Sequence, residues 1–235
     1  MYLPTHFNVD SPELVKAYVD AHPLALLVCT GDDGLPCANH VPLRLFESAD
    51  AMAPSPIDGA ADGRPVGNDT AAAPAHTAPS WRLEGHLARA NPQIEQLRRT
   101  RQALVIFGGP GAYVSPSLYD AVKAVPTWNY IAVHLSVEVA LVEAEADKDA
   151  LLKRLIGVHE PAYAARWRAM PADYQHNMLG AIVGVQLAVT RVEAKFKLSQ
   201  NRPEADRQRV HDAHAGGAPA QQEMAEWMKR LGAAT

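Results

Sequence analysis

The sequence predicts a mainly β protein with peripheral helices, whose core is an antiparallel barrel of about six strands. Three observations lead to this fold class. Several segments alternate apolar and polar residues with a period of two, which is typical of half-buried strands. Most of these segments are not separated by crossover helices. No GxGxxG or Walker-type glycine loop follows any of them, which argues against a doubly wound nucleotide-binding fold.

Length and composition fit one large globular domain or two small ones, and we place a single domain at residues 1–235. Of the 235 residues, 48% are hydrophobic and 20% are charged, so a wholly disordered chain is excluded. The net charge of −4 gives no global positive field that would gather nucleic acid or an anionic membrane. The N-terminus, MYLPTHFNVD, lacks signal-peptide regions, and no window reaches the roughly 18 apolar residues of a membrane span. We therefore expect a soluble, cytoplasmic protein with no membrane partner.

The spacing of cysteine and histidine residues predicts neither disulfides nor a metal site. Cys29 and Cys37 flank a Gly/Asp/Pro turn and match neither a disulfide framework nor a CxxC motif. We interpret them as small buried thiols of a cytosolic protein. Histidines without ligand spacing are expected to be ordinary surface or core residues. These dispersed histidines are His6, His40, His86, His134, His159 and His176.

The N-terminal part predicts a helix followed by a hairpin. Ser11 and Pro12 are an N-cap and first-turn signal for a short amphipathic helix that ends near His22. LALLVCT is then an apolar run, turn residues follow at 31–34, and CANHVPLRLF returns with alternating side chains, as in a β-hairpin. Pro42 inside the second strand indicates an edge or a bulge.

Two segments differ in composition from the rest of the chain. Residues 48–80 consist mostly of Ala, Pro, Gly and Asp without aromatic residues or periodicity, which predicts a disordered insertion within the domain. Residues 203–235 form a polar tail that we expect to be helical. Four of its residues recur at helical spacing: Met224, Trp227, Met228 and Leu231.

Several strands and helices are predicted in the remaining parts of the chain. Asn91 and Pro92 cap a helix with a basic end, ALVIFGG is a buried strand, and GPGAYVSPSLY is a loop punctuated by Gly and Pro. TWNYIAVHLSVEVALVEA is a long alternating strand. Helical signals follow at 148–159 and 171–178, before a second long strand, IVGVQLAVTRVEAKFKLS.

Two groups of residues have the chemistry of a binding site. His86 and Arg89 lie just before the helix start at Asn91, which outlines an anion site, because helix N-terminal amides are unpaired and arginine binds phosphate with two hydrogen bonds. The alternative is that Asn91 is only a cap and Arg89 a solvated side chain. Lys195 and Lys197, with Ser199, share one face of a strand and favour an anion, unless they only guard an exposed strand edge.

An aromatic group opens the first long strand. Trp128, Asn129 and Tyr130 combine a flat ring, a carboxamide and a phenol, a set that stacks on and hydrogen-bonds a planar heterocycle. Aromatic residues that simply close a barrel end are the alternative.

Taken together, these segments resemble the PaiB-like FMN-binding negative transcriptional regulators, in the flavin-binding split-barrel superfamily with pyridoxamine phosphate oxidases. The matching blocks span most of the chain: MYLPTHF at the start, NHVPL at 39–43, GHLARANPQ at 85–93, FGGPGAYVSPSLY at 107–119, VPTWNYIAVHL at 125–135 and AKFKLSQNRP at 194–203. The sequence departs from the family at the insertion 48–80, where a short turn is usual, and at Val137, where a glycine is expected.

The resemblance implies a six-stranded antiparallel split β-barrel that forms a homodimer, with two FMN molecules at the subunit interface. It places the FMN phosphate near His86, Arg89 and Asn91, with His40 on a neighbouring strand. The ring system is then expected near Tyr113, Ser115, Trp128 and Asn129. Lys195, Lys197, Gln200 and Asn201 close the site, from the same or the second subunit.

Two functions remain open at this stage. The first is an FMN-binding transcriptional regulator, although the acidic charge and the lack of a recognizable helix-turn-helix do not support direct DNA binding. The alternative is an FMN-dependent oxidoreductase or flavin reductase acting on a small molecule, since the flavin itself carries the redox chemistry. No residue stands out as a general acid or base, so catalytic residues are not assigned.

Overall fold

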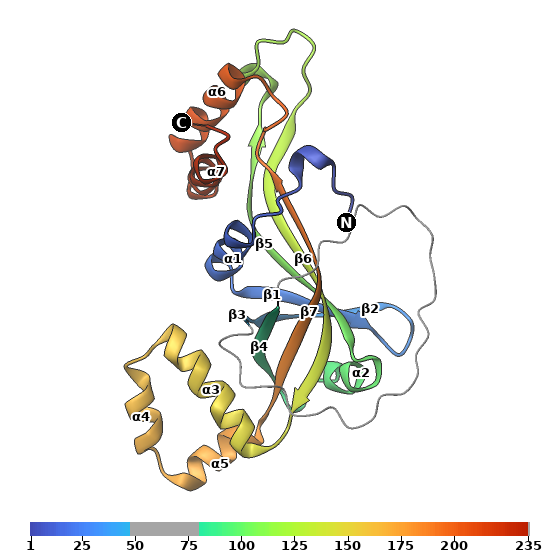
Figure 1. Ribbon diagram of the computed structural model, residues 1–235, viewed down its shortest axis with the longest axis vertical. Coiled ribbons are helices and arrows are strands. Elements are labelled where there is room, and N and C mark those ends of the chain that lie inside the picture. The colour runs from blue at the N-terminus through green and yellow to red at the C-terminus, as the bar shows by residue number, and fades with distance from the viewer. Residues whose placement is uncertain (48–79, 235) are drawn as a thin grey trace. The chain divides into compact units, whose positions relative to one another are not determined.

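One β-sheet, whose strands differ in length, forms the framework of the described residues (Figure 1). The computed structural model describes residues 1–47 and 80–234, so the predicted insertion at 48–80 lies outside the described residues apart from Ser80. The strand order within these residues is β2-β1-β5-β6-β7-β4-β3. The strands are β1 (Leu24–Thr30), β2 (Pro36–Pro42), β3 (Arg44–Glu47), β4 (Trp81–Ala88), β5 (Gln102–Val114), β6 (Thr127–Val142) and β7 (Ile182–Lys197).

The sheet differs from the predicted barrel in strand number and closure. The described residues contain seven strands rather than six, because the second strand of the predicted hairpin ends at Pro42 and resumes at Arg44 as a separate strand. The order is linear, with β2 and β3 at its ends, so the described sheet is not closed. The edge position indicated by Pro42 is confirmed, since a proline has no amide to donate to a further strand.

Helices flank the sheet as the sequence predicted, with one addition. The α-helices are α1 (Pro12–Ala21), α2 (Gln93–Thr100), α3 (Glu145–His159), α4 (Tyr163–Ala169), α5 (Ala172–Gly180), α6 (Glu204–Ala215) and α7 (Pro219–Arg230), and the short 3₁₀-helices are η1 (Thr5–Phe7) and η3 (Pro116–Leu118). Helix α4 was not predicted. None of the helices described in 1–47 and 80–234 is long and apolar enough to cross a membrane.

The chain divides into two compact units, and strands β5, β6 and β7 contribute residues to both. Unit 1 comprises Met1–Ala25, Ile106–His134 and Glu193–Thr235. Unit 2 comprises Leu26–Val105 and Leu135–Val192. Within unit 1, α6 and α7 lie side by side, and within unit 2, α3, α4 and α5 form a group (Figure 1).

Unit 1 is built around an aromatic core. Ser11 caps α1 through its hydroxyl, which accepts from the Leu14 amide at 3.2 Å, as predicted. The Tyr18 ring on α1 packs at 5.7 Å from Phe196 and 5.3 Å from Trp227, measured between centroids. The three segments of unit 1 therefore meet in one core, because the Tyr18 hydroxyl also donates to the Ile131 carbonyl at 3.1 Å.

Strand β5 is longer than predicted and passes through the residues that were assigned to a loop. It continues through Gly108, Gly109 and Pro110 to Val114. Gly109 explains why the local signal was misleading, because a Cβ atom there would lie 2.7 Å from the Tyr18 hydroxyl and 2.8 Å from the His22 ring. This glycine allows a close approach of α1 rather than a turn.

Unit 2 contains a buried ionic cluster on its sheet. Glu84 of β4 is 0% exposed and lies opposite Gln186 of β7 in the strand register. Its carboxylate accepts from Arg154 Nε at 2.8 Å and Nη2 at 2.9 Å, and from Gln186 Nε2 at 3.1 Å. Arg82 Nη2 lies 2.7 Å from the same carboxylate. The cluster ties α3 to strands β4 and β7 within unit 2.

The predicted insertion offers a direct test of the domain assignment. Replacing residues 48–80 by a short glycine-containing turn should leave folding and flavin binding unchanged, because the segment is expected to contribute no core residue and closure entropy grows slowly with loop length. Circular dichroism and thermal melting of the shortened chain would measure this. Insoluble protein or a large fall in melting temperature would show that the segment is structural.

Candidate functional site

The start of α2 in unit 2 is capped by the residue that the sequence indicated. The Asn91 side-chain oxygen accepts from the Gln93 amide at 3.0 Å, and the Asn91 carbonyl accepts from the Ile94 amide at 3.1 Å. This is the geometry of an N-cap, although the helix begins formally at Gln93. Asn91 therefore acts as a helix cap, which is the structural alternative considered for it in the sequence analysis.

Arg89 is held by partners within unit 2. Its Nε donates to the Gly180 carbonyl at 2.7 Å and its Nη2 to the Ile182 carbonyl at 3.2 Å. The Glu143 carboxylate lies 3.8 Å from Nη1, and Arg89 is still 46% exposed. A phosphate would therefore meet a half-exposed guanidinium whose position is already fixed by backbone carbonyls.

The two histidines of the predicted phosphate site lie on strands of unit 2. His40 is exposed on β2, and His86 on β4 is opposite Gly184 of β7. Partial burial lowers the pKa of His86, because desolvation disfavours the imidazolium. The lowered pKa favours the neutral imidazole, so the fixed positive charge of this set comes from Arg89.

The remaining predicted site residues belong to unit 1, where two lysines surround one aromatic ring. Lys195 Nζ lies 5.4 Å and Lys197 Nζ 6.0 Å from the centroid of the Tyr130 ring. Lys197 donates to the Trp128 carbonyl at 2.6 Å and to the Thr127 hydroxyl, and Lys195 donates to the Tyr2 carbonyl at 3.2 Å. Burial lowers the pKa of Lys197, and the charges of Lys195 and Arg202 lower it further.

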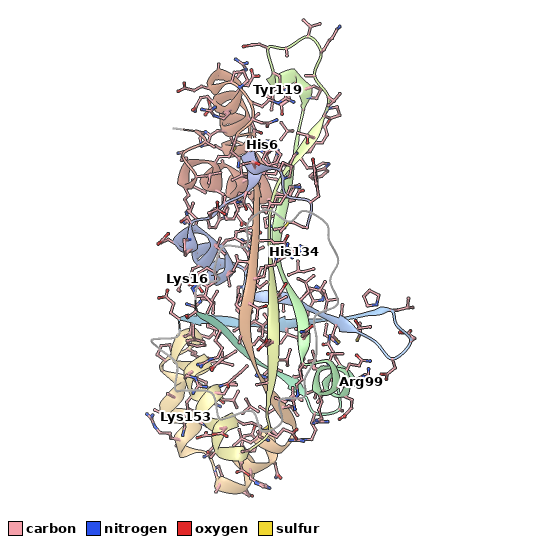
Figure 2. The ribbon with its side chains drawn as sticks, turned by 45° about the vertical axis from the view of Figure 1, so that its right-hand side comes forward. His6, Lys16, Arg99, Tyr119, His134 and Lys153 are labelled. Carbon is pink, nitrogen blue, oxygen red and sulfur yellow. The ribbon has the colours of Figure 1, made fainter. Side chains whose placement is uncertain are left out.

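These lysines have the electrostatics of an anion site. Within the described part of unit 1, their side chains contact carbonyls, a hydroxyl and aromatic rings. The charge of Arg202 also acts on Lys197, and its guanidinium lies 4.2 Å from the centroid of the ring of Tyr119, a residue labelled in Figure 2. An anionic ligand would offset the repulsion from Lys195 and Arg202, which adds to the effect of burial on the pKa of Lys197.

Exposed aromatic side chains lie on the same unit. Trp128 is 56% exposed and Tyr113 is 49% exposed, and their rings pack edge to face with centroids 5.9 Å apart. A large exposed aromatic pair is unusual on a soluble surface and can stack on a planar ligand.

The other predicted residues of unit 1 have internal partners. Asn129 is fully buried and its carboxamide oxygen accepts from the Ser199 hydroxyl at 3.1 Å. Just beyond the end of β7, the Gln200 side chain accepts from the Leu198 amide at 2.7 Å and donates to the Phe196 carbonyl. The Ser115 hydroxyl accepts from the Ser117 amide at 3.2 Å, whereas Asn201 is exposed.

Ser199 was wrongly placed on the face of the two lysines. Strand β7 ends at Lys197, and Ser199 takes a positive φ of 66°, so its side chain turns inward and is 4% exposed. The period of two applies only as far as the strand continues.

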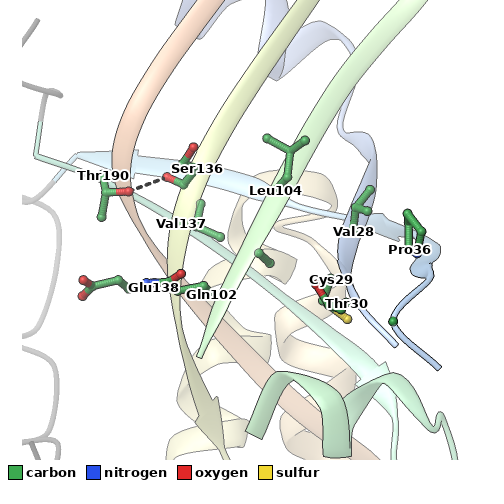
Figure 3. Close-up of a pocket in the computed structure, with 12 residues that line it drawn as sticks. Val28, Cys29, Thr30, Pro36, Gln102, Leu104, Ser136, Val137, Glu138 and Thr190 are labelled. Atoms are coloured by element: carbon green, nitrogen blue, oxygen red, sulfur yellow. Dashed lines mark hydrogen bonds between the residues drawn. The ribbon is translucent and has the colours of Figure 1, made fainter. Parts of the chain in front are cut away.

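Unit 2 also contains a cavity of about 540 Å³ that the sequence did not indicate (Figure 3). Its lining comes from strands β1, β2, β5, β6 and β7 and from the turn between β1 and β2, and the Thr190 hydroxyl donates to the Ser136 carbonyl at 3.1 Å. None of the predicted site residues lines it, but Val137, the departure from the family pattern, does. Its lining residues are Val28, Cys29, Thr30, Gly34, Pro36, Gln102, Ala103, Leu104, Ser136, Val137, Glu138 and Thr190.

The fold is shared with solved structures of low sequence identity. The flavocytochrome Anf3 from Azotobacter vinelandii superposes with a TM-score of 0.53 at 18% identity, over 81% of this chain and 69% of that chain. The FAD and heme binding protein from Mycobacterium smegmatis gives a TM-score of 0.54 at 18% identity, over 81% of this chain and 73% of that chain. These likenesses define the fold class of the protein.

Sequence comparison then identifies the family. The chain belongs to the family described as "Putative FMN-binding domain", whose model matches residues 1–191. It is 30% identical over 211 residues to the protease synthase and sporulation protein PAI 2 of Bacillus subtilis, covering 88% of this chain and 85% of that protein. The resemblance to the PaiB-like family that the sequence blocks indicated is confirmed.

Proposed function

We propose that this protein binds FMN at a homodimer interface and acts as a regulator of the PaiB type. The family match across residues 1–191 is the observation that carries the proposal. FMN would bring a dianionic phosphate, a planar ring and, when bound, one- and two-electron redox chemistry. The protein's part is to bind the phosphate, orient the ring and exclude water from it.

The chemistry of the predicted residues supports this cofactor in each unit separately. In unit 2, the Arg89 guanidinium suits the phosphate, with His86 as a hydrogen-bonding neighbour, whereas the first amides of α2 are already bonded to Asn91 and Pro92. In unit 1, the exposed pair Trp128 and Tyr113 suits the ring, and the lysines suit negative charge. The internal partners of Asn129 favour a supporting role for it through Ser199, rather than direct contact with the ring.

Titration of the flavin-free protein with FMN and with riboflavin tests the proposal. FMN should bind much more tightly, because only FMN carries the phosphate, and quenching of flavin fluorescence would measure both affinities. Arg89→Ala should weaken FMN binding by about 1.5–3 kcal/mol, the size of hydrogen bonds to charged groups, and leave riboflavin binding nearly unchanged.

Arg99→Ala is the matched control for that variant. Arg99 lies on α2, is 57% exposed and pairs with Asp32 at 2.5 Å, so its loss should not change FMN affinity. Equal affinities for FMN and riboflavin would exclude the phosphate assignment. Failure to bind either flavin would exclude the function itself.

The homodimer carries its own prediction. If FMN binds the dimer alone, added FMN should raise the melting temperature and suppress dissociation on dilution, by mass action. Sedimentation at several protein concentrations, with and without FMN, measures this. A monomer that holds one FMN per chain at micromolar concentration would contradict the interface assignment.

A further inference from the structure

The hairpin of β1 and β2 in unit 2 brings the two cysteines of the chain to opposite positions. The Gly31 amide donates to the Leu35 carbonyl at 2.7 Å, and the Gly34 amide donates to the Gly31 carbonyl at 3.1 Å. Gly34 has a φ of +79°, which completes a tight turn. Gly31 and Leu35 are thus the first paired residues of the hairpin. Cys29 lies two residues before Gly31 and Cys37 two residues after Leu35, so the two cysteines are directly opposite each other.

Directly opposite residues of an antiparallel pair project to the same face of the sheet. Their Cα atoms lie about 4.5–5.5 Å apart, and disulfides join Cα atoms about 4.4–6.8 Å apart. The face that carries the cysteines is turned toward α2, where Gln93 Nε2 lies 3.6 Å from the Cys29 sulfur. A disulfide therefore fits this pair without a new backbone register.

The glutamine beneath the hairpin holds both strands in this register. The Gln93 side chain is fully buried and donates to the Leu27 carbonyl at 2.9 Å and to the Cys37 carbonyl at 3.2 Å. Its own oxygen accepts from the Asn39 amide group at 3.0 Å. The two cysteine positions are thus fixed from the side of α2 as well as by the turn.

The two thiols differ in access to solvent. Both are free thiols, and Cys29 is buried while Cys37 is half-buried, so the expectation that both are buried is correct for Cys29 alone. Burial raises the pKa of the Cys29 thiol, and the neighbouring Cys37 thiol raises it further against the opposing effect of Gln93. An oxidant would therefore meet Cys37 first.

We propose that Cys29 and Cys37 are a reversible redox pair, oxidised to an intramolecular disulfide by hydroperoxides. The Cys37 thiolate attacks hydrogen peroxide, which leaves a sulfenic acid on Cys37 and releases hydroxide. The Cys29 sulfur then attacks the Cys37 sulfur, the S–S bond forms and the hydroxyl leaves as water. In sum, two thiols and one hydrogen peroxide give one disulfide and two water molecules.

The cysteine pair lies at the cavity of unit 2, because Cys29 is one of its lining residues. Strands β1 and β2 supply Val28, Cys29, Thr30 and Pro36 to the lining of this cavity (Figure 3). Oxidation would therefore place a disulfide beside this cavity, on a hairpin whose outer strand β2 has no further strand next to it among the described residues.

Oxidation of the reduced, full-length protein with stoichiometric hydrogen peroxide tests the proposal. Titratable thiols should fall from two to none, the intact mass should fall by two hydrogens, and non-reducing peptide mapping should link the peptides of Cys29 and Cys37. Dithiothreitol should restore both thiols. The rate should rise with pH through the range where thiols ionise, because the thiolate is the nucleophile.

Cys29→Ser and Cys37→Ser are the matched controls, since each leaves one thiol and cannot form the link. If either variant fails to fold, the mapping of the unaltered protein decides the question alone. Two thiols that stay titratable, separate addition of oxygen to each cysteine, or disulfides only between chains would each overturn the proposal.

Discussion

Replacing Glu84 by alanine should lower the free energy of unfolding by about 3–5 kcal/mol, the usual effect of removing one partner from a buried ionic cluster. Glu84 is 0% exposed, and its carboxylate is shared by Arg82, Arg154 and Gln186. Without it, the Arg82 guanidinium, which is 9% exposed, loses a carboxylate that lies 2.7 Å from its Nη2. Urea denaturation followed by circular dichroism would measure the change.

The control for this variant is an ion pair on the surface of the same unit. Asp32 is 71% exposed and pairs with Arg99 at 2.5 Å, so Asp32→Ala should cost about 0–1 kcal/mol. Glu84→Gln should lie between the two, because it keeps hydrogen-bond acceptance but loses the charge. If Glu84→Ala were as mild as Asp32→Ala, the cluster would not stabilise unit 2.

Trp227→Ala should destabilise unit 1 by about 3–5 kcal/mol, as large-to-small substitutions of buried aromatic residues do. Trp227 on α7 is 3% exposed and packs edge to face with Tyr18 at 5.3 Å and Phe196 at 5.8 Å. The residue lies beyond the part of the chain that the family model matches. Thermal unfolding of the flavin-free protein would therefore show whether α7 belongs to the core of unit 1.

Trp128→Ala removes the same side chain at a position that is 56% exposed, and it provides the comparison. In flavin-free protein it should change stability by about 0.5 kcal/mol or less. Equal effects of the two tryptophan substitutions would mean that α7 is only loosely attached to unit 1.

Periodicity in the sequence predicted the strands well where side chains alternate clearly. The long strand β6 shows this, with Ile131, Val133 and Leu135 buried as expected. The path of β5 through Gly109 was missed, because a glycine needed for the approach of α1 has the same local signature as a turn. Helix α4 was missed because it is short and only Trp167 is buried on it.

The sequence indicated which residue types form the candidate site, but it did not indicate the groups to which their side chains are hydrogen-bonded. The spacing correctly indicated a helix cap at Asn91, because its oxygen bonds only two residues along the chain. The bonds of Arg89 to the Gly180 and Ile182 carbonyls join residues about ninety positions apart, and no local pattern reports them. The cavity over β1, β5, β6 and β7 was missed since its lining residues are ordinary strand residues.

The interleaving of segments also sets the order in which the two units can be completed during synthesis. Unit 2 has all its residues once Val192 has been added, whereas unit 1 still requires Glu193–Thr235. At about 5–20 residues per second, this last segment takes about 2–9 seconds to translate. Phe196 is added early in that interval, but Trp227 is added near its end, and both pack against the Tyr18 ring in the folded protein. A ribosome that pauses before Trp227 would therefore hold a nascent chain whose aromatic core is still open.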